Sequence, residues 1–400
     1  MNKTYKHTSI GRIPNDWEVK KLGEISIIQG DYGINASAVE YSDGLPTYLR
    51  ITDIDEEGNY CDKNKVSVDD VNYKNFILKN NDFVFARTGA SVGKTYLHNS
   101  KLNGDLVFAG FLIRFRVDEK KIFPYYLKIF TQTNKYWNWV NVFSMRSGQP
   151  GINSREYCNL QLPLPPLPEQ EAIAACLSTW DIAIEKQSQL INALQQRKKA
   201  LMQQLLTGKK RLLNPKNNQP FSHPWKEVKL GEVCEITTGR LDANAMRENG
   251  KYRFYTCAKE FYRINEYAFD TEALLISGNG AHVGYIHYYK GKFNAYQRTY
   301  VLDTFNQNIL FVKYFLEKFL HRRIFSEKKE GNTPYIVLST LSEMNIFLPS
   351  IEEQIAIAEV LSTADEELAL QKQLLVQYQQ QKKALMQQLL TGKKRLRIEN

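Results

Sequence analysis

The stretch at residues 86–97, ARTGASVGKTYL, contains the residue types of a phosphate-binding loop. A Walker loop needs the spacing G-x-x-x-x-G-K-[ST], because this length wraps enough backbone N–H groups around the phosphates before the Lys and the hydroxyl arrive. Here only three residues separate Gly89 from Gly93, and no acidic strand end of the Walker B type follows. ATP binding through Lys94 is therefore kept only as a minor alternative.

The same pattern recurs at residues 275–289, LISGNGAHVGYIHYY. Both stretches read as an apolar strand, a turn of the form G-A-x-V-G and a second strand. Tyr285 and Ile286 stand where the first stretch has Lys94 and Thr95. Since the glycines recur and the Lys-Thr pair does not, we predict a strand–turn–strand unit used twice, in which the glycines supply positive φ or close backbone approach.

Other catalytic or metal-binding constellations are not found in the sequence. Glu18-Val19-Lys20 and Glu227-Val228-Lys229 resemble part of a nuclease triad, but they lack a suitably placed aspartate, and surface strands are favoured. A G-x-G-x-x-G fingerprint and the Asn/Asp-Pro-Pro-aromatic tetrad of amino-methyltransferases are both missing. His282 and His287 have no second ligand pair beside them. We therefore predict no catalytic residue and no metal ligand in this chain.

The cysteines show neither a metal-ligand spacing nor a disulfide framework, which favours a reducing, cytoplasmic location. They are Cys61, Cys158, Cys176, Cys234 and Cys257. The first residues, MNKTYKHTSIGRIPNDWE, contain no apolar signal region, and no run approaches the roughly 20 apolar residues of a membrane span. We expect a cytoplasmic protein without a membrane association.

Length and composition favour several folded domains and a polyanionic partner. A chain of 400 residues is too long for one ordinary core, and its 43% hydrophobic and 12% aromatic content can build more than one. With 53 Lys and Arg against 43 Asp and Glu, the formal net charge is +10. This balance is compatible with nucleic-acid binding, although it also occurs for general solubility.

The chain contains a long internal repeat. Residues 198–212 read KKALMQQLLTGKKRL, and residues 382–396 read the same without a change. The correspondence extends back, ungapped, to Glu-Gln pairs at 169–170 and 353–354. Prolines precede each segment, while Gly208 and Gly392 stand where helix C-caps are expected.

Apolar residues at seven-, three- and four-residue steps predict that each copy is one long helix. They are Leu177, Ile184, Ile191, Leu194, Leu201 and Leu205 in the first copy, and Leu361, Leu368, Leu375, Tyr378, Leu385 and Leu389 in the second. A helix of about 40 residues is about 60 Å long. Two such stripes can bury their leucines against each other as an intramolecular coiled coil. The alternative is that each stripe packs only on its own neighbouring domain.

The segments before the two helices are related only loosely, and strand-like runs dominate them. We therefore predict an α+β fold: two mixed, strand-rich domains separated by two long helices that form an antiparallel coiled coil, as a pseudo-twofold repeat. The expected boundaries are 1–165 for the first domain, 166–212 for the first spacer helix, 213–350 for the second domain, and 351–400 for the second spacer helix with its tail.

This layout resembles the specificity subunit of type I restriction-modification systems. The resemblance covers essentially the whole chain and rests on Trp17 to Glu24, RTGASVGK, PLPPLPEQ and the duplicated KKALMQQLLTGKKRL. It implies that each variable domain reads one half of a split, asymmetric sequence in double-stranded DNA, and that the helices set the separation of the halves. It also implies docking of two methyltransferase subunits and of restriction-translocase subunits. S-adenosylmethionine, ATP and Mg²⁺ are then expected on those partners, and no cofactor in this subunit.

Candidate readers of DNA are polar residues on loops or strand ends beside glycine, because bases are read by paired donors and acceptors and phosphates by Lys and Arg. In the first domain they are Arg50, Thr52, Arg87, Thr88, Ser91 and Lys94. In the second they are Arg240, Asp242, Asn244, Lys259, Asn279, His282, Gln297 and Arg298. Arg50 and Arg298 are also candidates for buried ion pairs, and Asp242 for reading a cytosine amino group or orienting a neighbour.

Partner docking is assigned to the helices. The candidate residues are Gln170, Leu177, Leu201, Leu205, Gln354, Leu361, Leu385 and Leu389. The basic residues of the repeat, such as Lys198 and Arg211, have two readings that stay open here, a docking surface or phosphate contacts. A second function class also stays open, in which the chain is a coiled-coil adaptor whose domains bind protein or RNA. An adaptor would show little sequence preference for duplex DNA.

Overall fold

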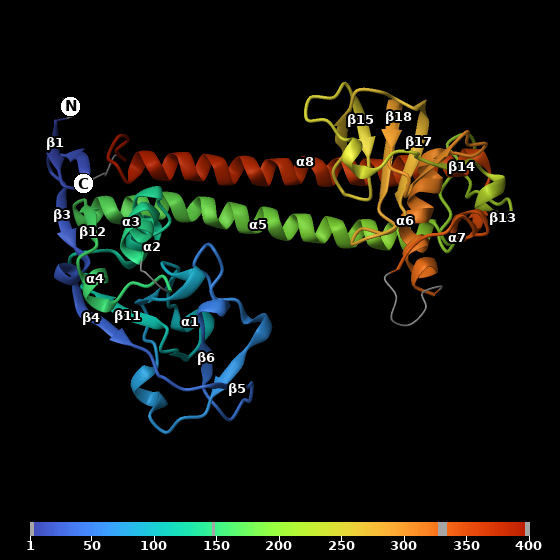
Figure 1. Cartoon of the computed structure of the whole chain (residues 1–400). Helices are drawn as coiled ribbons and strands as arrows, with labels where there is room; N and C mark the ends of the chain where they lie inside the picture. The colour runs from blue at the N-terminus through green and yellow to red at the C-terminus, as the bar shows by residue number, and fades with distance from the viewer. Residues whose placement is uncertain (1–3, 146–148, 327–333, 397–400) are drawn as a thin grey trace. The chain divides into compact units, whose positions relative to one another are not determined.

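The computed structural model describes residues 4–145, 149–326 and 334–396. They form two compact units, Met1–Lys186 with Leu375–Asn400, and Gln187–Leu374. Each unit thus contains one strand-rich domain and a part of each of the two long helices, α5 (Leu167–Leu205) and α8 (Ile351–Leu389) (Figure 1). The α+β fold class is confirmed. No helix within the described ranges is long and apolar enough to cross a membrane.

The first unit contains two four-stranded sheets, with strand orders β10-β6-β7-β5 and β4-β11-β8-β9, and two strand pairs, β1-β2 and β12-β3. Its strands are β1 (Tyr5–Thr8), β2 (Gly11–Pro14), β3 (Glu18–Lys21), β4 (Ser26–Tyr32), β5 (Ala38–Glu40), β6 (Thr47–Leu49), β7 (Val66–Val68), β8 (Asp82–Ala86), β9 (Thr95–Leu97), β10 (Leu106–Phe108), β11 (Leu112–Val117) and β12 (Gln161–Leu164). Its short helices are α1 (Ser100–Asn103), α2 (Pro124–Phe130), α3 (Asn134–Ser144) and α4 (Ser154–Cys158).

The side chains of β8 and β11 point alternately to the two faces of their sheet, and those on one face form the main core of the first unit. Phe83, Phe85 and Phe115 are fully buried and pack with Tyr136 of α3 and with the ring of Tyr157. Successive side chains of a strand point to opposite faces, so every second residue joins this core while its neighbours join the other one. The helices α2 and α3 therefore cover one face of this sheet.

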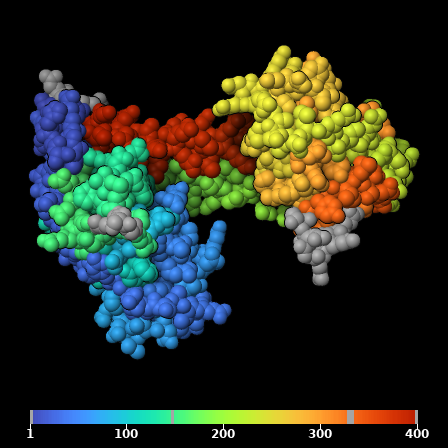
Figure 2. Space-filling view, in the orientation of Figure 1, coloured from blue at the N-terminus to red at the C-terminus, as the bar shows by residue number. Residues whose placement is uncertain are grey.

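The second unit is built around one six-stranded sheet, with the order β14-β19-β17-β18-β15-β16, and a separate pair, β13-β20. Its strands are β13 (Lys226–Lys229), β14 (Glu235–Thr238), β15 (Tyr252–Tyr255), β16 (Tyr262–Ile264), β17 (Phe269–Ser277), β18 (Ile286–Ala295), β19 (Thr299–Asp303) and β20 (Asn345–Leu348). Its shorter helices are α6 (Ile309–Ser326) and α7 (Leu338–Ser342). In the space-filling view, residues of this sheet and its loops, coloured yellow to orange, form much of the visible surface of the unit (Figure 2).

The segment at residues 255–258 contacts the chain near both ends of β18. The backbone N–H of Tyr296, just after β18, donates to Tyr255 O at 2.9 Å, and His287 near the start of β18 contacts Ala258 O at 2.9 Å. Both ends of one strand thus reach the same segment at residues 255–258. One face of the sheet packs on α6 through residues such as Leu274, while the other encloses a small aromatic core around Tyr255.

The two long helices pack together within each unit. In the first unit Leu177 of α5 and Leu389 of α8 belong to one core, and in the second Leu205 and Leu361 do. The coiled-coil prediction is thereby confirmed, and each pair also packs on its neighbouring domain. Residues early in one helix meet residues late in the other, as the 2.5 Å contact of Asp181 with Lys382 shows, so the pairing is antiparallel. The predicted C-cap glycines, Gly208 and Gly392, both have φ of 67°.

Candidate nucleic-acid interface

The stretch that resembles a Walker loop is a tight turn between two antiparallel strands, β8 and β9. Gly93 N donates to Ala86 O at 3.0 Å, and Ala86 N donates to Lys94 O at 2.8 Å. The second turn is built alike, since Gly284 N donates to Ser277 O at 2.8 Å. The prediction of one strand–turn–strand unit used twice is confirmed. A phosphate-binding loop is not supported, because backbone N–H groups of the turn already donate to carbonyl oxygens within the hairpin.

The glycines of these turns are required for two reasons. Gly89, Gly93, Gly280 and Gly284 have φ between 74° and 89°, a region that side chains with a Cβ rarely adopt. A Cβ on Gly93 would also lie 2.6 Å from Val140 of α3. One on Gly284 would lie 2.8 Å from a side-chain atom of α6. In both units the turn is therefore seated on a helix of its own domain.

A second turn lies beside each of these and is also shared by the two domains. In the first unit Leu112 N donates to Ala109 O at 2.8 Å. Its counterpart is the 2.8 Å bond from Thr299 N to Tyr296 O. The two turns are joined in the same way: Arg87 N donates to the carbonyl of residue 111, and Gly278 N donates to the carbonyl of residue 298.

A third segment, the chain after the first strand of the large sheet, completes the arrangement. Ile34 forms an isolated parallel bridge with Ala109, and Leu241 forms one with Tyr296. We call these three segments of each unit its loop cluster: residues 33–35, 87–91 and 109–111 in the first, and 239–244, 278–282 and 296–298 in the second. The backbone hydrogen bonds of the two clusters correspond, while their side chains differ.

All but one of the candidate readers in the second unit belong to its loop cluster, and the remaining one lies beside it. Arg240, Asn244 and Arg298 have exposed side chains. Asp242 accepts a hydrogen bond of 2.7 Å from the side chain of Gln297, so it orients a neighbour. The exception is Lys259, which is exposed beside the Cys257 thiol that contacts Arg298 O at 3.3 Å.

Asn279 and His282 sit on the repeated turn with partly exposed side chains. Residues far apart in the sequence are thus brought together by the sheet. The alternative of a buried ion pair does not hold for Arg298, because its side chain is exposed.

In the first unit the candidate readers are more constrained. Arg50 forms hydrogen bonds of 3.0 and 2.7 Å with the buried carboxylate of Asp53, which agrees with the ion-pair reading of this residue. Lys94 pairs with Glu56 at 2.7 Å and keeps 18% of its side chain exposed. Arg87 lies 4.7 Å over the ring of Tyr32. The remaining candidates are Thr52, which is exposed, and Thr88 and Ser91, which are half-buried. Their contacts with DNA stay a prediction.

Two aromatic residues were missed from the sequence, one in the first loop cluster and one directly before it. Tyr32 and Phe111 keep 41% and 60% of their surfaces exposed although both are aromatic. A search for polar residues beside glycine passes over GF at positions 110–111. The signal that would have found Phe111 is the correspondence with the exposed QR at 297–298, which only the backbone hydrogen bonds make visible.

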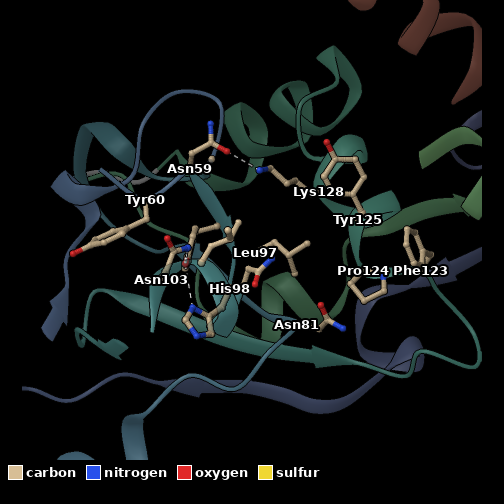
Figure 3. Close-up of a pocket in the computed structure, with 14 residues that line it drawn as sticks. Asn59, Tyr60, Asn81, Leu97, His98, Asn103, Phe123, Pro124, Tyr125 and Lys128 are labelled. Carbon is tan, nitrogen blue, oxygen red and sulfur yellow. Dashed lines mark hydrogen bonds between the residues drawn. The ribbon is translucent and has the colours of Figure 1, made fainter. Parts of the chain in front are cut away.

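An open cavity of about 390 Å³ lies in the first unit, and no residue of the loop cluster lines it. Figure 3 shows Lys128 pointing toward Asn59, whose side-chain oxygen accepts its hydrogen bond at 2.8 Å. Burial lowers the pKa of Lys128. Buried His98 lines the same cavity and contacts the Tyr96 hydroxyl at 3.1 Å. None of the candidate site residues lines this cavity.

The residues that were considered from the sequence for catalysis or metal binding, and were not favoured, make common structural contacts. Glu18 pairs with Lys20 at 3.0 Å on the exposed strand β3. Among the described residues no group of three or more His, Cys, Asp or Glu is arranged to hold a metal ion. His287 contacts a backbone carbonyl, and burial lowers its pKa.

The long helices are joined to each domain by the same polar contacts in both units. Lys382 lies 2.5 Å from Asp181, whose other oxygen accepts a 2.6 Å hydrogen bond from the Tyr125 hydroxyl. Burial, together with Asp181, raises the pKa of Tyr125 well above its usual range. In the second unit Lys198, Asp365 and Tyr314 repeat this arrangement with distances of 2.5 and 2.9 Å.

A second joint closes the ends of the helices. Arg395 donates from its Nε and from one terminal nitrogen to the buried carboxylate of Glu169, and the indole N–H of Trp17 donates to the same carboxylate at 3.0 Å. In the second unit Arg211 binds the buried Glu353 at 2.6 Å. Two of the basic residues in each copy of the repeat are therefore intramolecular partners.

Most of the proposed docking residues are buried inside the chain's own units. Gln170 donates to Pro165 O at 2.9 Å and accepts from Phe123 N at 2.9 Å. Gln354 makes the same pair of contacts, with Pro349 O at 2.9 Å and with a backbone N–H before α6. Leu177, Leu205, Leu361 and Leu389 are buried, whereas Leu201 and Leu385 are half-buried. Any effect of the buried ones on docking would act through the helix pair, and the docking role stays a prediction.

Comparison with known proteins agrees with this duplicated architecture. The sequence matches the type I restriction modification DNA specificity domain over residues 14–196 and again over 222–379. It is 28% identical over 425 residues to the putative type I restriction enzyme MjaX specificity subunit of Methanocaldococcus jannaschii, with 99% of this chain and 97% of that protein covered. It is 43% identical over 170 residues to the type I restriction enzyme EcoDI specificity subunit of Escherichia coli, which covers 42% of this chain and 37% of that protein.

The fold is likewise shared with solved structures. A crystal structure of the type I restriction-modification S subunit from M. genitalium matches with a TM-score of 0.63 at 16% identity, covering 98% of this chain and 99% of that one. A chain from a structural study of complex assembly and conformational transition of the type I system matches with a TM-score of 0.56 at 18% identity, covering 95% and 99%. Because the specificity domain matches both halves of the sequence, the chain belongs to the specificity subunits of type I restriction-modification systems, the non-catalytic DNA specificity component of these enzymes.

Proposed function

We propose that this subunit reads a bipartite, asymmetric site in double-stranded DNA, one half with each loop cluster. The observation that carries the proposal is the pair of corresponding backbone frames with different side chains. Because the backbone hydrogen bonds correspond, side chains at matching positions of the two loop clusters have the same orientation relative to their own domain. Different side chains, such as Lys94 in one and Tyr285 in the other, then select different bases.

The charge and exposure of the second loop cluster support this role. Arg240, Lys259 and Arg298 present cationic groups that can bind phosphates, and the exposed amides of Asn244 and Gln297 have the paired donor and acceptor that reads adenine. The net charge of +10 favours association with a polyanion. An adaptor for proteins would not need two such clusters.

The long helices are proposed to dock two methyltransferase subunits, with restriction-translocase subunits joining the larger complex. The identical sequence of the two repeats supports two equivalent docking surfaces. Their ion-paired residues build the joints described above, while Lys199, Lys209, Lys210, Lys383 and Lys394 are exposed and free to face a partner or phosphates. S-adenosylmethionine, ATP and Mg²⁺ would be held by those partners. The helices would also set the separation of the two half-sites.

The test is a map of methylated bases in a host genome with and without this gene, in the presence of its methyltransferase partners. We expect one bipartite motif to lose its methylation when the gene is deleted. Purified complex should also bind duplexes with this motif far more tightly than scrambled duplexes, with an affinity that falls steeply as salt rises. An unchanged map together with binding that ignores sequence would favour the adaptor.

A further inference from the structure

The turn at Ala109–Leu112 holds an aromatic side chain in solvent on a fixed backbone. Leu112 N donates to Ala109 O at 2.8 Å, and Gly110 N donates to Ile34 O at 2.8 Å. The carbonyl of Phe111 accepts from Arg87 N at 3.0 Å. The Phe111 side chain nevertheless keeps 60% of its surface exposed. A single exposed apolar residue is common on protein surfaces, so the exposure of Phe111 alone indicates no function.

The surroundings of Phe111 combine a second aromatic ring with a cation. Gly33 N donates to Leu112 O at 3.2 Å, which places the neighbouring Tyr32 beside the turn. The Arg87 guanidinium lies over the Tyr32 ring, and no acidic side chain in the described part of the chain pairs with it. Tyr32 is held in turn, because its hydroxyl accepts from Ser154 N at 3.2 Å. We call Tyr32, Arg87 and Phe111 the aromatic tip.

The second unit has a turn that corresponds to this one. Its turn at 296–299 has the same three bonds, from Thr299 N, from Gln297 N to Leu241 O at 2.9 Å, and to the carbonyl of Arg298. Phe111 therefore corresponds to Arg298, and Gly110 to Gln297. The turn that offers an exposed guanidinium and an amide in one domain offers a benzyl group in the other.

From this correspondence we propose that Phe111 makes an apolar contact with a base of the half-site read by the first domain. An aromatic side chain can select a base through a thymine methyl group or by stacking between bases. The Arg87 guanidinium beside it supplies charge for the adjacent phosphates. The rigid turn means that little conformational entropy is lost on contact. This inference rests on the proposed function and adds the residue and the chemistry of one base contact.

The test compares the methylated motifs of complexes that contain wild-type chain, Phe111→Ala, Arg298→Ala or a control variant. The control is Val71→Ala, because Val71 is an apolar residue of the same unit with 92% of its surface exposed. We expect Phe111→Ala to relax one position in one half-site and to lower affinity for the original motif about tenfold. Arg298→Ala should relax a position in the other half-site, and Val71→Ala should change nothing.

The outcome that overturns the proposal is a Phe111→Ala complex that methylates the wild-type motif with wild-type efficiency. A wild-type complex without any bipartite motif would instead refute the proposed function itself. If Phe111→Ala abolishes all methylation, Phe111→Leu decides, because it keeps an apolar side chain of similar reach. A motif retained with Leu supports the base contact, and its loss with Leu as well argues against it.

Discussion

Single buried charges hold the ends of the long helices. Glu169 is 1% exposed, and a carboxylate at such a position is stable only if its charge is matched. Arg395 supplies the match and is itself held by Asp16 at 2.7 Å. The hydrogen bonds that Arg395 donates to Asp16, and then to Glu169, raise the pKa of Arg395. Each copy of the repeat thus ends in an arginine that pairs with a buried glutamate of the other long helix.

Removing Arg395 should destabilise the first unit strongly. We expect Arg395→Met to lower the free energy of unfolding by about 3 kcal/mol, because it leaves Glu169 charged and buried. The neighbouring exposed lysine gives the control, Lys394→Met, for which little change is expected. Thermal and urea unfolding of the purified chain measure both. The double variant Glu169→Gln with Arg395→Met should recover part of the loss, and no recovery would mean that the arginine acts through packing alone.

Buried His98 predicts a pH dependence of stability. Asn103 donates to the Tyr96 hydroxyl at 2.7 Å, which leaves the tyrosine proton for His98 Nδ1. Burial lowers the pKa of His98 below its ordinary 6.5, against the opposing pull of Asp82 and Asp105. Below about pH 6.5 the unfolded chain therefore takes up a proton that the folded chain refuses.

The free energy of unfolding should fall as pH drops below about 6.5, by up to about 1.4 kcal/mol per pH unit from this residue. This loss of unfolding free energy ends once the pH has fallen below the pKa of His98 in the folded state. Melting temperatures between pH 8 and pH 5 should decline less in His98→Gln than in the wild type. The exposed His7 supplies the control His7→Gln, which should follow the wild-type curve. Parallel curves for His98→Gln and wild type would contradict the prediction.

At the scale of elements, the repeated turn shows why its glycines recur while the residues after them vary. Gly93 has φ of 89°, and its missing Cβ leaves room for Val140, which is buried. Backbone strain and helix packing both depend on the glycine, so a change there acts on the whole domain. Lys94 follows the turn and depends on neither, so it is free to differ between the two domains.

Replacing Gly93 by Ala should therefore cost more than replacing a glycine in open surroundings. Gly104 has φ of 63° and no atom within 4 Å of an added Cβ. We expect Gly104→Ala to cost about 1 to 2 kcal/mol for its backbone conformation alone, because a φ of 63° with a ψ of −155° is favourable only for glycine. Gly93→Ala adds the clash with Val140, for a total of about 2 to 4 kcal/mol. Urea unfolding of the two variants tests the order, and equal losses would mean that α3 moves aside at no cost.

The elements were predictable from the sequence to very different degrees. The two long helices follow from a heptad pattern of leucines and from prolines and glycines at their ends, signals that are local and strong. The pairing of β11 with both β4 and β8 has no such local signal, because it joins residues that lie 81 to 91 positions apart for β4 and 26 to 34 positions apart for β8. The repeated turn was found because its glycines recur, whereas its contact with α3 needed the structure.

The candidate site shows the same division. Polar loop residues such as Gln297 and Arg298 were found by type and neighbourhood, and the sheet brings them together. Phe111 was missed because its role is visible only from hydrogen bonds that match it to Arg298. Lys94 and Arg50 were named as readers, yet both have acidic partners whose positions depend on the fold. Sequence patterns identify what a side chain can do, but not which partner it already has.

At the scale of the whole molecule, each domain meets the long helices through the same contacts. A tyrosine binds the Asp–Lys pair of the helices, and the Glu-Gln entry of a helix closes on an arginine from the end of the other. The match is not complete, since Trp17 donates to Glu169 while the indole N–H of Trp225 finds no acceptor in the described residues. The sequence of the domain can therefore vary, provided that its tyrosine still binds the aspartate of the Asp–Lys pair.

This equivalence predicts that the second domain can be replaced by a copy of the first. In such a chain residues 17–164 take the place of 225–348, between the opening tryptophan and the proline that precedes each long helix. The copied Tyr125 should bind Asp365 as Tyr314 does, so the chain should fold and assemble with its partners. Its methylated motif should contain the first half-site in both halves and lose the second, as genome-wide methylation sequencing would show. The reciprocal chain with two second domains should give the other half-site twice. Folded chimeras that keep the original motif would mean that the loop clusters do not select the bases. Chimeras that fail to fold would mean that the contacts between domain and long helices are not equivalent in the two units.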